Sequence, residues 1–159
     1  MPTATQRRPA SSLSALLAGL QAGMLGVWWM LAWMGASAIW QRHSFWTPEN
    51  LMASVFYGNA AIRPGFGAST VSGLALYVLV YSLLGAGFAI ALGGRLPRPR
   101  LALASIAFAL CWYYVAFHLV AKAVSPLVVL LDTERTTFLG HALYGVLLAR
   151  FPVYLKAES

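Results

Sequence analysis

The sequence predicts an all-α membrane protein, built as a four-helix transmembrane bundle. Four apolar segments, residues 13–40, 69–93, 101–121 and 136–155, are each about long enough to cross a bilayer as a helix, which takes roughly 20 residues. The 159-residue chain is 60% hydrophobic and only 9% charged, whereas soluble domains carry about 25% charged residues. We therefore expect one bundle over residues 13–155, with short cytoplasmic tails at residues 1–12 and 156–159.

The basic residues orient the predicted bundle. With the amino terminus in the cytoplasm, the inner side carries Arg7, Arg8, Arg95, Arg98, Arg100, Arg150 and Lys156. The outer side then carries Arg42, Arg63, Lys122 and Arg135. Because an excess of Lys and Arg marks cytoplasmic loops, both termini are expected inside. The net charge of +7 comes from residues that flank apolar segments rather than from a basic patch, so nucleic-acid binding is not expected.

The first outer loop, residues 41–68, contains a predicted short interfacial helix. Thr47 is expected to cap this helix, and Glu49 lies near its positive end. The apolar residues that follow are Leu51, Met52, Val55 and Phe56. This pattern is typical of a helix lying on the membrane surface. A plain connector is favoured over a lid or docking surface.

An internal similarity suggests two tandem helical hairpins. Residues 73–77 read Gly-Leu-Ala-Leu-Tyr, and residues 140–144 read Gly-His-Ala-Leu-Tyr. The aromatic-rich stretches 28–33 and 112–117 align in the same way. A duplicated two-span unit keeps its orientation, as in parallel repeats.

Glycines provide candidate helix-packing positions. Small residues spaced four apart let transmembrane helices approach closely. The candidates are Gly19, Gly23, Gly73, Gly85, Gly140 and Gly145.

Three histidines fall toward the predicted outer side. His118 and His141 lie near the outer ends of the third and fourth segments, and His43 lies in the first outer loop. The favoured interpretation is that His118 and His141 form interhelical hydrogen bonds. A second is a transition-metal site of His43, His118 and His141 with Asp132 or Glu134, since imidazole and carboxylate suit such metals. A third is haem held between His118 and His141.

Other chemistry has little support in the sequence. No carboxylate lies inside an apolar segment, and Asp132 and Glu134 are expected to form a surface ion pair with Arg135. The single cysteine, Cys111, excludes an intramolecular disulfide. Phosphate-binding and dinucleotide-binding motifs are absent from the sequence. A non-enzymatic protein without a cofactor is therefore favoured.

The pattern Gly140-His141-x-x-Tyr144-Gly145 resembles the last span of small uncharacterised bacterial inner-membrane proteins. The glycine-rich first span and the arginine-proline loop at residues 95–100 are also similar to that group in style. The resemblance implies a bacterial cytoplasmic membrane, but it assigns no activity and no functional residue.

Three functional hypotheses follow. The first is a structural or accessory subunit that joins a membrane-protein partner or forms a homo-oligomer. The second is a haem- or metal-binding redox protein that uses the outer histidines. The third is a carrier of a small solute or lipophile that acts as an oligomer, because four spans alone enclose little space.

Overall fold

A computed structural model describes residues 12–92, 95–124 and 126–157. Within these ranges the chain is helical and contains no strand. Four helical stretches, Ser12–Trp40, Ala68–Leu92, Arg98–Val124 and Glu134–Leu155, are long and apolar enough to cross a membrane. The predicted fold class is confirmed: the chain is an all-α, multi-pass integral membrane protein. The predicted tail at residues 1–11, with Arg7 and Arg8, lies outside the described residues.

The helices follow one another in a simple order. They are α1 (Ser12–Trp40), α2 (Thr47–Tyr57), the 3₁₀ turn η1 (Gly58–Ala61), α3 (Ala68–Leu92), α4 (Arg98–Tyr114), the π-helical turn η2 (Val115–Val120), α5 (Ala121–Val124), α6 (Pro126–Leu131), α7 (Glu134–Leu148) and α8 (Phe151–Ala157). The third span therefore consists of α4, η2 and α5. The fourth consists of α7 and most of α8, with a turn at Ala149 and Arg150 between them.

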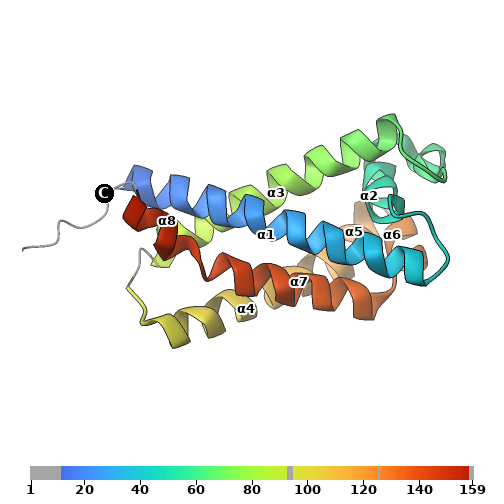
Figure 1. The fold of residues 1–159 in the computed structure, drawn as a ribbon. Coiled ribbons are helices and arrows are strands. Elements are labelled where there is room, and N and C mark those ends of the chain that lie inside the picture. The colour runs from blue at the N-terminus through green and yellow to red at the C-terminus, as the bar shows by residue number, and fades with distance from the viewer. Residues whose placement is uncertain (1–11, 93–94, 125, 158–159) are drawn as a thin grey trace, which may run out of the picture.

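Helix α1 is the centre of the bundle (Figure 1). It packs against α3 on one flank and α7 on the other, and α4 packs against α7. Each predicted hairpin is thus a packed pair, α1 with α3 and α4 with α7. Helices α2, α5 and α6 gather at one end of the bundle, called here the α2 end, and the start of α1 lies beside α8 at the other (Figure 1). Helices α3 and α4 meet through ring side chains, with the centroids of Phe88 and Phe108 5.1 Å apart.

Glycines bring the backbones of α1 and α3 together. A Cβ atom added to Gly19 would lie 2.5 Å from the carbonyl oxygen of Gly85. One added to Gly23 would lie 2.6 Å from the carbonyl oxygen of Tyr81. Both distances are shorter than van der Waals contact. Any larger residue would therefore force the two helices apart.

The other candidate glycines meet different neighbours. A Cβ added to Gly145 would lie 2.7 Å from the α4 backbone, whereas Gly140 lies against side chains of α1. Gly73 faces the carbonyl group of Glu49, so α2 crosses α3 at this glycine without room for a methyl group. This contact between Gly73 and Glu49 packs α2 directly against α3.

Helix α2 forms as predicted, but its capping residue and its surroundings differ from the prediction. Trp46 occupies the cap position, and its side chain makes no capping bond. Thr47 is already helical, because the N–H of Asn50 donates to the carbonyl oxygen of Trp46 and starts the helix there. The polar side of α2 faces the bundle, and Leu51 is only 3% exposed. Only the last turn, with Phe56 60% exposed, presents a large apolar surface to the surroundings.

Candidate functional site

A network of hydrogen bonds around His141 joins α7 to α3. His141 is 3% exposed, and its Nδ1–H donates to the carbonyl oxygen of Thr137 at 2.7 Å. Since a carbonyl can only accept, Nε2 carries the lone pair and accepts from the Tyr81 hydroxyl at 2.5 Å. The Tyr144 hydroxyl donates to the carbonyl oxygen of Tyr81 at 2.6 Å. His141 is therefore a neutral imidazole with both ring nitrogens engaged by the protein.

His118 lies in the π-helical turn, a conformation that is rare and often found at functional sites. Its Nε2 is 3.6 Å from Oε1 of Glu134, which also accepts a hydrogen bond from the Tyr113 hydroxyl at 3.3 Å. The ring of Tyr113 contacts both imidazoles, with centroid distances of 5.9 Å to His118 and 5.3 Å to His141. The haem hypothesis stays a prediction. It requires an iron bound at Nε2 of His141 to displace the Tyr81 hydroxyl.

Asp132 and His43 line a small cavity of about 20 Å³ between α1, α2 and the start of α7. This volume is close to that of one water molecule. Asp132 accepts hydrogen bonds from the N–H of Thr133 at 2.9 Å and from the hydroxyl of Thr137 at 2.6 Å. Burial raises the pKa of Asp132 above its ordinary value. Asp132 thus connects to His141 through Thr137.

The expected ion pair between these acids and Arg135 is wrong. Among the described residues, Glu134 is paired with His118. Asp132 is turned inward to the threonines instead. No three His, Cys, Asp or Glu side chains within the described ranges are grouped to hold a metal ion. The metal site of His43, His118, His141 and Asp132 stays a prediction.

Asn50 anchors the loop that follows α2. It is 2% exposed, and its Nδ2 donates to the carbonyl oxygens of Arg63 at 2.8 Å and Gly65 at 3.1 Å. Its Oδ1 accepts from the hydroxyls of Thr70 at 2.7 Å and Ser69 at 3.1 Å. One side chain therefore binds the loop to the start of α3. The sequence pattern did not identify Asn50 as a site residue.

Glu49 is a buried acid at the α2 end. Its side chain is 1% exposed, and Oε2 has no hydrogen-bond partner among the described atoms. Burial raises the pKa of Glu49 to about 7. A carboxyl group with such a pKa is protonated in a large fraction of molecules near neutral pH. The sequence placed this residue in an outer loop, where it would be solvated.

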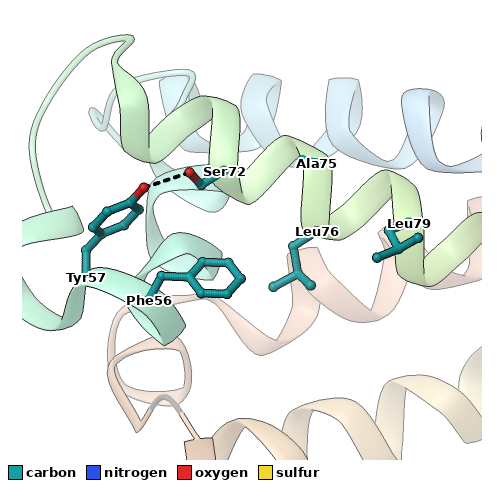
Figure 2. Close-up of a pocket in the computed structure, with 6 residues that line it drawn as sticks. All are labelled: Phe56, Tyr57, Ser72, Ala75, Leu76 and Leu79. Carbon is teal, nitrogen blue, oxygen red and sulfur yellow. Dashed lines mark hydrogen bonds between the residues drawn. The ribbon is translucent and has the colours of Figure 1, made fainter.

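Two surface grooves lie near the α2 end. One, of about 460 Å³, is formed by α2 and α3 and is lined by Phe56, Tyr57, Ser72, Ala75, Leu76 and Leu79 (Figure 2). The other, of about 530 Å³, lies between α4 with its π-helical turn and α7, and it includes His118 and Glu134. Both volumes fall in the range of ligand sites, roughly 300–1,000 Å³.

Two tryptophans form an unusual surface in the middle of α1. Trp28 is 51% exposed and Trp29 is 56% exposed. The helix runs from Ser12 to Trp40, so its midpoint falls at residue 26. Both tryptophans therefore lie within about 5 Å of the helix midpoint along its axis, at 1.5 Å per residue. Ala32 and Ala36 continue the exposed stripe from Trp28 at four-residue spacing. We call these four residues the tryptophan face.

Comparisons with protein-family models, with curated proteins and with solved structures find no match for the chain.

Proposed function

We propose that the protein is a non-enzymatic membrane subunit that self-associates through the tryptophan face of α1. The observation that carries this proposal is the exposure of Trp28 and Trp29 near the middle of a transmembrane helix. Tryptophan is normally enriched at the two membrane–water interfaces, where its N–H group finds polar partners.

The hydrocarbon region offers an indole no hydrogen-bond acceptor, and an unsatisfied donor there is costly. Neither indole has a hydrogen bond within the described part of the chain. A second transmembrane helix would replace lipid with packed side chains. Ala32 and Ala36 suit such an approach, because small residues four apart allow close contact between helices. A two-fold dimer would place this same face on both partners.

The interior supports a scaffold role. The hydrogen bonds of His141 engage both ring nitrogens, so this imidazole is not free to act as a base in this arrangement. The same bonds join α3 to α7 across the bundle. A bundle joined by such bonds leaves the tryptophan face of α1 exposed to a second copy.

The test is the size of the assembly in a lipid bilayer. The double variant Trp28→Leu/Trp29→Leu should convert an oligomer to monomers when subunits are counted by single-molecule photobleaching in vesicles. Trp40→Leu is the matched control, because Trp40 is 90% exposed at the end of α1, where tryptophan is ordinary. A monomeric natural protein, or a double variant that stays oligomeric, refutes the proposal.

We also propose that the protein lies in a bacterial inner membrane with both termini in the cytoplasm. The excess of basic residues on the predicted inner side supports this orientation. Reporter fusions after Ser159 and within residues 41–68 should give opposite locations. Reporters on the same side would contradict the orientation.

A further inference from the structure

The groove between α2 and α3 has an apolar body and a polar end. Along α3 it extends from Ser72 to Leu79, and Phe56 of α2 faces the same space as Leu76 (Figure 2). Seven residues of helix correspond to about 10 Å. At the α2 end the hydroxyls of Tyr57 and Ser72 are 2.9 Å apart. That bond uses one of the two hydroxyl hydrogens, which leaves the other able to donate to a ligand.

The orientation of the groove matches that of a lipid in one leaflet. A leaflet contributes about 15 Å to a hydrocarbon core of about 30 Å. The groove runs along a transmembrane helix for about 10 Å from near its α2 end. Its polar end therefore lies toward the headgroups, and its apolar end toward the middle of the bilayer.

A second cavity, of about 340 Å³, adjoins the polar end. Tyr57 lines both cavities, and the second is otherwise formed by the segment after α2, which includes Arg63, and by the start of α3 at Ser69. In the described part of the chain no carboxylate pairs with the exposed Arg63. The buried Asn50 holds the carbonyl group of Arg63 at 2.8 Å, so the backbone that carries this cation is fixed in place.

We propose that the groove and the adjoining cavity bind one anionic phospholipid from the leaflet on the α2 side. Its phosphate lies at Arg63, an ester carbonyl accepts from the Tyr57–Ser72 pair, and one acyl chain follows α3 toward Leu79. A cation fixed beside an apolar groove at headgroup level is complementary to that ligand.

The polar end must decide which lipid binds. An acyl chain gains little by leaving other acyl chains for an apolar groove, because the two surroundings are similar. A neutral lipid would occupy the groove no better than bulk lipid does. Attraction of an anionic headgroup to one basic residue is worth roughly 1 kcal/mol, which corresponds to a preference of about fivefold.

The test uses the full chain purified in detergent and exposed to equal amounts of phosphatidylglycerol and phosphatidylcholine. Native mass spectrometry should show about fivefold more bound phosphatidylglycerol. Arg63→Gln should abolish this preference, whereas Arg42→Gln, which removes another exposed arginine of the same loop region, should retain it. The Arg63 side chain makes no hydrogen bond in the described structure, so its replacement should leave the unfolding midpoint in lipid-free detergent unchanged.

A second pair of variants tests the acyl-chain groove. Ala75→Phe places a ring in the groove and should reduce bound phosphatidylglycerol, whereas Ala107→Phe, at an exposed alanine of α4, should not. Inorganic phosphate alone should compete poorly, because it lacks the acyl chain that keeps the headgroup of a micelle lipid close to the groove. Equal retention of both lipids, a preference that survives Arg63→Gln, binding unaffected by Ala75→Phe, or full competition by phosphate would each overturn the proposal.

Discussion

Replacing Glu49 by glutamine should stabilise the protein at pH 8 and have little effect at pH 5. The carboxyl group is 1% exposed, and burial raises its pKa from 4.5 to about 7. When the chain unfolds, the group returns to water and to its ordinary pKa. The folded protein therefore binds more protons than the unfolded chain between these two pKa values, and its stability falls as the pH rises through them.

The magnitude follows from the difference between the pKa values. From 4.5 to about 7 is a difference of about 2.5, and each pKa unit corresponds to about 1.4 kcal/mol. The natural protein should thus lose about 3 kcal/mol of unfolding free energy between pH 4.5 and pH 7 through this residue. Glutamine is nearly the same size and cannot ionise, so Glu49→Gln should recover most of that loss at pH 8.

Unfolding by sodium dodecyl sulfate in mixed micelles, followed by tryptophan fluorescence, measures the effect at pH 5 and pH 8. Asp132 also has a raised pKa and adds a dependence of the same sign, so the difference between the natural protein and Glu49→Gln isolates Glu49. Glu134→Gln is the control, because its side chain is 65% exposed and its replacement should leave the fall in stability intact. Equal stability of the natural protein and Glu49→Gln at pH 8 would refute the burial argument.

Three further predictions concern packing and hydrogen bonding, and the same unfolding assay measures each. Gly73→Ala should lower the free energy of unfolding by roughly 1–3 kcal/mol, because its new methyl group meets the α2 backbone. Its control, Gly87→Ala, has open space around the new methyl group and should be neutral or stabilise the protein by up to about 1 kcal/mol. Equal effects of the two variants would argue against the α2 contact. Gly19→Leu should separate α1 from α3 and cost more than Gly73→Ala, and an unchanged unfolding midpoint would contradict this close approach. Tyr81→Phe removes the bond to His141 and should cost roughly 1 kcal/mol with the fold intact; no loss would mean that the bond adds nothing.

The helices themselves were predictable because transmembrane helices depend on local composition. The predicted second span at residues 69–93 corresponds to Ala68–Leu92, and the predicted third span at residues 101–121 lies inside Arg98–Val124. The third helix begins before its predicted start, at Arg98 in the charged loop, because Pro99 is compatible with a first helical turn. Helix α2 was also predicted, but Thr47 was chosen as its cap on residue type, whereas the first helical hydrogen bond is accepted by the carbonyl oxygen of Trp46.

The site was less predictable because its partners come from distant segments. The sequence identified His141 as a candidate, but its partner Tyr81 is 60 residues away. Nothing in the sequence distinguishes Tyr81 from other tyrosines in apolar spans. The sequence also assigned Asp132 to a surface ion pair, and folding turned it toward Thr137. Nothing near Glu49 in the sequence indicates burial, which results from α2 crossing α3 at Gly73.

The sequence by itself determined that four helices cross a membrane, because hydrocarbon selects every crossing segment for length and low charge, whatever it packs against. Only the tertiary structure decided that α1 is central, that Glu49 of α2 is buried against α3, and that Trp28 and Trp29 remain exposed near the middle of α1. These properties depend on which faces of the helices meet. In a chain whose spans are apolar on all sides, hydrophobic patterning does not specify those faces, and close packing and a few interhelical hydrogen bonds do.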